Sequence, residues 1–246
     1  MAFNSTFGRV FSPTFQPCSV VSGVEPWWLS GGIAAANCVA AYQPKGALNF
    51  ESSKINLADP GVYDLINGVA YPSWETGSGW TFAKASVQYL YISSAIVSVK
   101  PLSMICRFYP VDVLTNYALM SINNSTSSSY YYGLFALGGV AGDPVQAGER
   151  GTTAVGALTT TSFTATSWHI ACGVYITNTS RSAYLDAGGV GTNTTTSNPT
   201  GLNLTKIGAY LSENSLPFDG KIAACAFYNI NITDYIASLT AAMNAL

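Results

Sequence analysis

The chain has 246 residues and a formal net charge of −2, and 48 % of its residues are hydrophobic while only 9 % are charged, against roughly 25 % charged residues in an average globular domain. Intrinsic disorder is excluded, because disordered chains combine low hydrophobicity with high net charge. There is no basic surplus that could bind nucleic acid or an anionic membrane through counterion release. With 23 glycines and 11 prolines, this composition predicts a weakly charged, turn-rich, all-β protein.

The start of the sequence lacks the positively charged segment and the roughly 7–15-residue apolar core of a secretory signal peptide. The five cysteines are widely spaced and include no Cys-x-x-Cys pair, which argues against a zinc site. Three of them, Cys106, Cys172 and Cys225, stand in apolar runs. We therefore expect buried free thiols and synthesis in a reducing cytoplasm.

Residues 1–40 differ in composition from the rest, because three prolines interrupt them and Trp27 and Trp28 stand side by side. Proline and glycine at this density disfavour helix and central strand. We expect an extended N-terminal arm with one short helix around residues 33–36. Either this arm covers a sheet of its own domain or it docks on a neighbouring subunit. In the second case Trp27 and Trp28 are the anchors, since buried tryptophans dominate interface energetics, and the arm contributes more to assembly than to stability.

From about residue 80 onwards, short apolar runs alternate with turn clusters, as in a β-sandwich. Apolar residues recur at every second position in most runs, so that one face of each strand meets the core. The predicted strands span residues 88–92, 102–109, 117–122, 130–137, 168–176, 181–186, 204–210 and 221–228. Loops are expected at 138–151 and 187–201.

The last segment of the sequence predicts a short helix. Thr233 is the candidate N-cap, and Ile236, Leu239 and Met243 fall on one helical face. No second domain of comparable size is indicated. We expect one domain over residues 41–246, preceded by the arm.

The C-terminal half also contains a set of short motifs in a fixed order. These are Trp168-His169-Ile170-Ala171, Tyr184-Leu185-Asp186, Lys206-Ile207-Gly208, Phe218-Asp219-Gly220-Lys221-Ile222 and Phe227-Tyr228-Asn229. In order and spacing they resemble the laminin G-like, concanavalin A-like domains, which implies a jelly-roll β-sandwich of two antiparallel sheets. The likeness covers roughly residues 74–246, and the sequence departs from it at Ala187, where the family has glycine. Calcium is common in that family, but its ligands match no residues here, so no cofactor or metal site is assigned.

Residues 38–74 resemble a leader that precedes such domains in bacteriophage genes. The likeness rests on Cys38-Val39-Ala40-Ala41-Tyr42-Gln43-Pro44-Lys45-Gly46-Ala47, on residues 56–64 and on Pro72-Ser73-Trp74. It implies a structural virion protein, placed on the head or the tail and made in the host cytoplasm.

The residues needed for catalysis are not found in a recognisable arrangement. Retaining glycosidases place two carboxylates about 5–5.5 Å apart, and the E-x-D-x-x-E strand that would supply them is absent. The glutamates, Glu149 among them, stand in loop-like contexts, while Asp186 and Asp219 belong to turn motifs. His169 is the single histidine and no Gly-x-Ser-x-Gly elbow occurs. We therefore expect no enzyme activity and a partly exposed, structural His169.

The aromatic residues of the sequence are candidates for glycan binding. On strands they are ordinarily core or cross-strand pairs, but rings stacked on sugar faces also bind glycans in β-sandwich lectins. The candidate groups are Trp27/Trp28, Trp74/Trp80, Tyr89/Tyr91 and Tyr130/Tyr131/Tyr132. Two functions follow. The first is a non-enzymatic virion protein that contacts other virion subunits and its own copies and presents a glycan-binding surface. The alternative is a carbohydrate-binding adhesin module outside a virion, with cell-surface glycans as partners. Neither function involves nucleic acid or a membrane.

Overall fold

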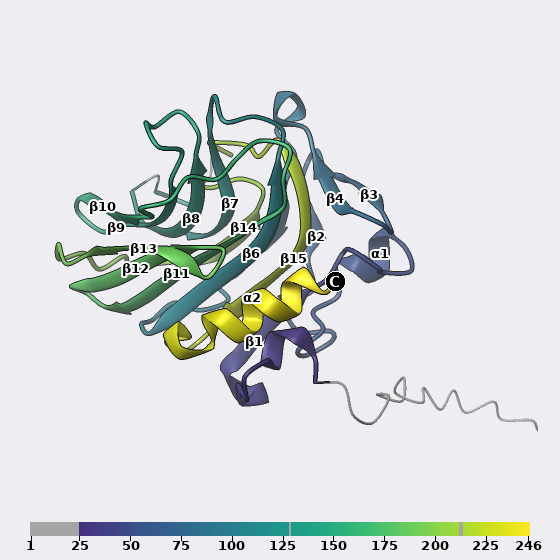
Figure 1. Cartoon of the computed structure of the whole chain (residues 1–246), viewed down its shortest axis with the longest axis horizontal. Coiled ribbons are helices and arrows are strands. Elements are labelled where there is room, and N and C mark those ends of the chain that lie inside the picture. The colour runs from purple at the N-terminus through teal and green to yellow at the C-terminus, as the bar shows by residue number, and fades with distance from the viewer. Residues whose placement is uncertain (1–24, 128, 212–213) are drawn as a thin grey trace, which may run out of the picture.

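Two antiparallel β-sheets pack face to face in the computed structural model, which describes residues 25–127, 129–211 and 214–246 (Figure 1). Sheet A contains, in spatial order, β13 (Gly188–Asn193), β12 (Ser180–Leu185), β11 (His169–Thr177), β6 (Leu102–Pro110), β15 (Gly220–Tyr228), β4 (Gly79–Phe82) and β3 (Ser73–Glu75), and β1 (Cys38–Tyr42) pairs with β15. Sheet B contains β10 (Ala154–Leu158), β9 (Val145–Arg150), β8 (Tyr131–Leu137), β7 (Asn116–Asn123), β14 (Leu204–Ile207), β5 (Leu90–Ile92) and β2 (Ile66–Asn67). The expected jelly-roll sandwich is confirmed.

Each predicted strand has a counterpart in the structure, with ends shifted by a few residues. The two predicted loops are wrong. Residues 138–151 contain β9, and residues 187–201 contain β13, while β10 lies just after the first of these segments. β13 has the sequence GGVGTN, which has low strand propensity. Its pairing with β12 overrides that propensity.

The space between the sheets is filled by large inward-facing side chains. Trp80, Phe108, Tyr117, Tyr132 and Tyr175 belong to one cluster of fully or almost fully buried residues. Their alternation with outward-facing residues along each strand is the pattern from which the sandwich was predicted.

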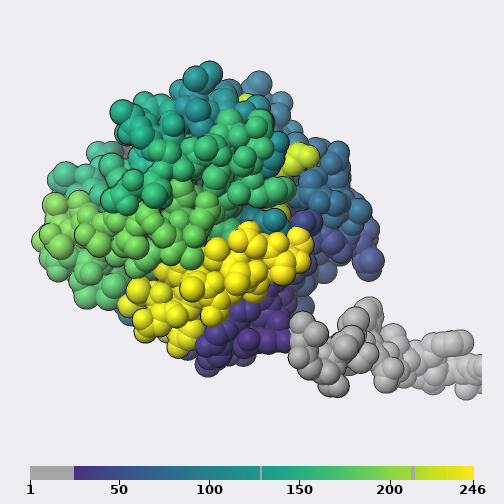
Figure 2. All heavy atoms as spheres, viewed as in Figure 1, coloured from purple at the N-terminus to yellow at the C-terminus, as the bar shows by residue number. Residues whose placement is uncertain are grey.

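The outer face of sheet A is covered by a second apolar layer. The helix α2 (Ile236–Asn244) buries Ile236, Leu239 and Met243 against it, as the sequence predicts. Figure 2 shows α2 and the segment that follows residue 24 lying together on this side of the molecule. Because both faces of sheet A are buried, strands such as β11 and β15 are almost continuously apolar. Thr233 is not the N-cap of this helix, because it begins the 3₁₀ turn η4 (Thr233–Tyr235) and Tyr235 is the N-cap of α2. Asn231 Oδ1 accepts from the Thr233 N–H at 2.9 Å and from the Thr233 hydroxyl at 2.7 Å.

The described part of the arm packs on its own domain. The 3₁₀ turn η1 (Trp27–Leu29) contacts α2 and β1, and the Tyr228 hydroxyl donates to the Trp28 carbonyl at 3.0 Å. The short helix expected at residues 33–36 is a 3₁₀ turn, η2 (Ala35–Asn37). The boundary expected between residues 40 and 41 falls inside β1. Residues 1–24 lie outside the described residues.

Two further short helical segments lie in connections, α1 (Phe50–Ser53) and η3 (Lys84–Ser86). In the described part of the chain, no helix has the length and apolar character needed to cross a bilayer. The four described cysteines, Cys38, Cys106, Cys172 and Cys225, are buried free thiols, as expected. Burial raises the pKa of Cys38 to about 12. Cys18 lies outside the described residues.

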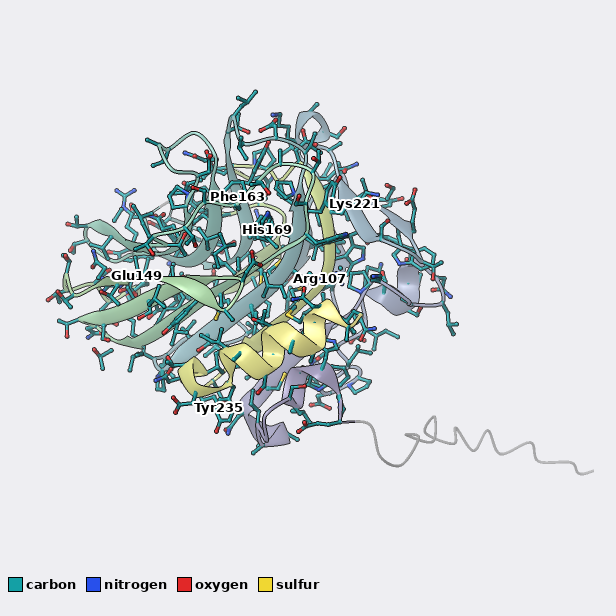
Figure 3. All side chains as sticks on the ribbon, viewed as in Figure 1. Arg107, Glu149, Phe163, His169, Lys221 and Tyr235 are labelled. Carbon is teal, nitrogen blue, oxygen red and sulfur yellow. The ribbon has the colours of Figure 1, made fainter. Side chains whose placement is uncertain are left out.

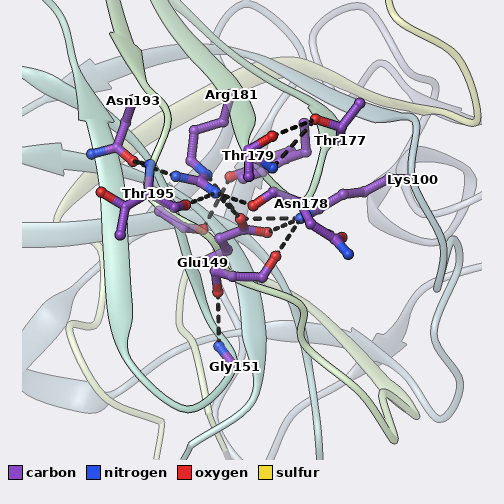
Figure 4. A network of polar contacts seen from close by, with 12 residues as sticks. Lys100, Glu149, Gly151, Thr177, Asn178, Thr179, Arg181, Asn193 and Thr195 are labelled. Carbon is purple, nitrogen blue, oxygen red and sulfur yellow. Dashed lines mark hydrogen bonds and ion pairs between the residues drawn. The ribbon is translucent and has the colours of Figure 1, made fainter.

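A buried ionic network joins the two sheets near the end of β9 (Figure 4). Glu149 is fully buried, and its carboxylate lies 2.6 Å from Arg181 Nη2 on β12 and 2.8 Å from Lys100 Nζ. Arg181 also donates to Asn193 and to the Thr195 carbonyl. A charged group at an inward position breaks the apolar alternation of β9, which explains why the sequence predicted a loop there. Because Glu149 points inward, its neighbour Arg150 points to the outer face of sheet B.

Candidate ligand-binding cleft

Among the described residues, none forms a layer on the outer face of sheet B comparable to α2, and a cleft of about 210 Å³ lies on this face. Outward-facing residues of β7, β8 and β9 form one side, and the connection between β14 and β15 forms the other. The lining residues are Asn116, Tyr131, Phe135, Leu137, Gln146, Tyr210 and Leu216.

Three aromatic rings form the centre of the cleft, and each pair is in edge-to-face contact. The ring centroids lie 5.9 Å apart for Tyr131 and Phe135, 5.3 Å for Tyr131 and Tyr210, and 5.2 Å for Phe135 and Tyr210. Such geometry is favoured by the ring quadrupoles and holds the three side chains in fixed orientations. Phe135 is only 3 % exposed and forms the floor, whereas Tyr131 and Tyr210 are half-buried and face the opening.

Glycines make the floor flat. Gly133 on β8 and Gly148 on β9 are opposite each other, and a Cβ atom would lie 2.3 Å from the Phe135 ring at Gly133 and 2.9 Å from it at Gly148. The ring therefore lies directly on the backbone of these strands. Larger residues at either position would displace Phe135 and with it the contact to both tyrosines.

Tyr210 comes from the connection between β14 and β15, which is fixed to the sheet at several points. Tyr210 and Ser215 exchange two backbone hydrogen bonds, at 3.1 and 2.9 Å. The Ala118 N–H donates to the Leu216 carbonyl at 2.8 Å, and the Ser121 hydroxyl donates to the Ala209 carbonyl at 2.9 Å. These bonds place Tyr210 over β8 before any ligand arrives.

The polar groups of the cleft include two amides and the tyrosine hydroxyls. Gln146 stands opposite Phe135 on β9, and Asn116 stands opposite Leu137 on β7. Asn116 Oδ1 accepts from the Gly139 N–H at 3.0 Å, which orients its amide. Arg150 stands opposite Tyr131 at the far end of the same two strands. Burial raises the pKa of Tyr131 to about 12, and the charge of Arg150 acts against this rise. The Tyr131 hydroxyl is therefore neutral at physiological pH and able to donate a hydrogen bond.

Among the aromatic groups singled out in the sequence, Tyr131 lines the cleft. Its neighbour Tyr132 lies between the sheets, with its ring 5.1 Å from Tyr175. Trp80 is buried and donates to the Ser53 hydroxyl, and Trp74 donates to the Pro44 carbonyl. Tyr89 and Tyr91 lie at the β5 side of sheet B, where the Lys206 ammonium lies 4.7 Å from the Tyr89 ring.

The proposed anchors Trp27 and Trp28 lie away from this cleft, on the side of sheet A. Trp27 is 5 % exposed and packs in the cluster beneath α2, and Trp28 is half-buried with its ring at 5.8 Å from that of Trp27. Their role in assembly stays a prediction.

Phe135, Gln146 and Tyr210 were not singled out in the sequence. Gln146 lies in a segment for which the sequence predicts a loop, so the face that it occupies on β9 was not predicted. Phe135 and Tyr210 come from separate segments, and no local pattern signals that they meet. The alternation of Val145, Ala147 and Glu149 with Gln146, Gly148 and Arg150 was the available sign of a strand.

His169 is part of a polar contact at the start of β11, beside Phe163 (Figure 3). Its Nδ1 lies 2.8 Å from Asp186 Oδ2, and its Nε2 accepts from the Thr164 backbone N–H at 3.0 Å, with the Thr164 hydroxyl also at 3.0 Å. A hydroxyl, an imidazole and a carboxylate in line are the geometry of a catalytic triad. Here the backbone N–H already occupies the imidazole lone pair, so we interpret the contact as a link between the 159–168 loop and the β12–β13 turn.

The described acidic side chains do not gather into a metal site. Within the described ranges, no group of three or more His, Cys, Asp or Glu residues could hold a metal ion. Asp64 instead accepts from the Asn56 and Gly61 backbone N–H groups, at 2.8 and 3.3 Å, as expected of a turn residue.

Solved structures share the fold of this chain, whereas the sequence comparisons find no match. No protein-family model matches the chain, and no curated protein matches it. Domain 4 of AbnA, a GH43 extracellular arabinanase from Geobacillus stearothermophilus solved in complex with arabinotriose, matches with a TM-score of 0.63 and 15 % identity, over 83 % of this chain and 98 % of that domain. The likeness is one of fold.

A second solved structure is NanB sialidase from Streptococcus pneumoniae, with a TM-score of 0.52 and 15 % identity over 66 % of this chain. The match spans only 27 % of the sialidase. Both similarities are to β-sandwich domains of carbohydrate-active proteins, and they give the bacteriophage resemblance no support.

Proposed function

We propose that the chain is a carbohydrate-binding module without enzyme activity, and that its ligand binds in the cleft on sheet B. The observation that carries this proposal is the fixed cluster of Tyr131, Phe135 and Tyr210 beside the amides of Gln146 and Asn116. Sugars present apolar C–H faces and ring hydroxyls, which aromatic rings and amides complement. A concave, largely pre-formed site with convergent polar groups is typical of small-ligand binding.

The likeness to the arabinanase domain supports a glycan ligand, since that domain was solved with arabinotriose. The described residues that line the cleft include no catalytic acid or base, which supports ligand binding without turnover. None of its described lining residues is Asp, Glu or His, so the described part of the cleft supplies neither a general acid nor a carboxylate nucleophile.

The proposal is tested by calorimetric titration of the purified chain with a panel of neutral and acidic oligosaccharides that includes arabinotriose. We expect Tyr131→Ala to weaken the affinity for the bound glycan by about tenfold or more, equivalent to about 1.4 kcal/mol. Tyr71→Ala is the matched control, because Tyr71 is a half-exposed tyrosine outside the cleft. Failure of the whole panel to bind, or equal affinity of the Tyr131→Ala variant, would contradict the proposal.

The virion role, the assembly through Trp27 and Trp28 and the location in a bacteriophage particle stay predictions of the sequence. The structural observations above test none of them, although Trp27 and Trp28 pack on their own domain.

A further inference from the structure

Arg150 is the last residue of β9, and it stands opposite Tyr131 on β8 and Ala154 on β10. The alternation of β9 puts its side chain on the same face as Gln146, and therefore on the face that holds the cleft. The side chain is half-buried beside Tyr131.

The guanidinium of Arg150 has no partner among the described residues. It makes no hydrogen bond or ion pair with them, and its Nε atom is buried without an acceptor. The other described cations all have partners. Lys54, Lys84, Lys100, Arg181 and Lys221 pair with carboxylates, Lys45 and Arg107 donate to the Leu246 carbonyl, and Lys206 donates to the Leu211 carbonyl and Asn214. A buried donor without an acceptor costs free energy, which an incoming acceptor recovers.

The surroundings of Arg150 hold no described negative charge that could neutralise it. Its outward neighbours on β8, β9 and β10 are Tyr131, Gly148 and Ala154. Glu149 precedes it in the sequence but points into the sandwich, where Lys100 and Arg181 already bind its carboxylate. The result is an uncompensated, half-desolvated cation at one end of an aromatic cleft.

We propose that the cleft binds an acidic glycan, in which a sugar ring lies against Tyr131 and the carboxylate of that sugar pairs with Arg150. This inference rests on the proposed function and specifies its ligand class. The planar guanidinium matches a carboxylate with two parallel N–H···O bonds. Gln146 and Asn116 then serve the neutral hydroxyls of the neighbouring sugar. The carboxylate could come from a uronic acid or from a sialic acid, and the test separates these sources.

The experiment measures the affinity of the full chain for two matched pairs of ligands. The first pair is trigalacturonic acid and its methyl ester, and the second is 3′-sialyllactose and lactose. We expect the acidic member of one pair to bind at least tenfold more tightly than its neutral partner, and the preference to shrink as salt is added. The pair that shows the preference identifies the source of the carboxylate.

Two variants assign the preference to Arg150. In Arg150→Gln we expect the acidic and the neutral ligand to bind with equal affinity, because the charge that distinguishes them is gone. Arg150→Lys keeps the charge but not the two-pronged geometry and should retain part of the preference. Lys221→Gln is the matched control, because Lys221 is a partly exposed cation on sheet A. Since Arg150 makes no hydrogen bond or ion pair with described residues, its replacement should leave the melting temperature almost unchanged.

The outcomes separate this inference from the proposed function. Equal affinity for both members of each pair in the unaltered chain overturns the inference, and so does an acid preference that survives in Arg150→Gln. Either result leaves the proposed function standing as long as a glycan binds and Tyr131→Ala weakens it. Binding of no glycan at all overturns both.

Discussion

The outer faces of the two sheets differ in their side chains and in what packs on them. On sheet A, the outward residues of β11 and β15 are small or aliphatic apart from Tyr228, and they lie beneath α2 and η1. On sheet B, the outward residues of β8 and β9 include the rings of Tyr131 and Phe135, the Gln146 amide and Arg150 beside two glycines and Leu137. Among the described residues, the connection between β14 and β15 covers them in part. The covered face contributes stability, and the open face carries the candidate binding function. An apolar strand face therefore identifies a site only when nothing else in the chain packs on it.

The largest effect on both stability and binding is expected from a variant that disturbs the Glu149 network, which sets the orientation of β9. Glu149→Ala leaves Lys100 and Arg181 buried without their carboxylate, and we expect it to lower the free energy of unfolding by about 3–5 kcal/mol. The variant should also lose glycan affinity, because β9 carries Gln146 and Arg150. Denaturant unfolding and glycan titration measure the two effects. Glu51→Ala, which removes an exposed partner of Lys54, is the control and should change stability by less than about 1 kcal/mol. A stable Glu149→Ala protein with full affinity would contradict this prediction.

A second variant separates stability from binding on the covered face. Trp27→Ala removes a ring that is 5 % exposed beneath α2, and we expect it to cost about 3 kcal/mol of unfolding free energy with glycan affinity unchanged. Trp28→Ala should cost less, because that ring is half-buried.

The same pair tests the predicted arm. If Trp28 anchors the chain on a second subunit, Trp28→Ala weakens self-association in sedimentation while the melting temperature stays almost constant. Loss of stability without any change in association would assign both tryptophans to the fold alone.

The smallest effect on the free energy of unfolding is expected from alkaline pH, through the ionisation of Tyr131 on the outer face of sheet B. The Tyr131 pKa is about 12 in the folded chain against an ordinary value of 10.0, because burial disfavours the phenolate. Between these values the unfolded chain releases the proton and the folded chain retains it, so the free energy of unfolding falls as pH rises from about 10 towards 12. Tyr131→Phe should make this fall shallower than in the unaltered chain. Melting curves at several pH values measure the difference, and identical slopes would show that Tyr131 ionises as freely as in the unfolded chain.

The sequence by itself determined the parts that depend on local periodicity. Short apolar runs bounded by turn clusters predicted β6, β11 and β15. Helical spacing predicted the buried face of α2 from Ile236, Leu239 and Met243, and the apolar settings of the cysteines predicted buried thiols. These properties are local because strand and helix periods are set by the backbone.

Only the tertiary structure decided which face stays open and what meets on it. Glu149 is tolerated inside the sandwich because Lys100 and Arg181 reach it from other segments, and that contact turns Gln146 and Arg150 outward. Tyr210 joins Tyr131 and Phe135 because hydrogen bonds fix its connection over β8. Contacts between segments far apart in the sequence leave no periodic trace, since each residue alone is compatible with a loop, a core or a surface. The cleft therefore became visible once the sheets and their coverings were in place.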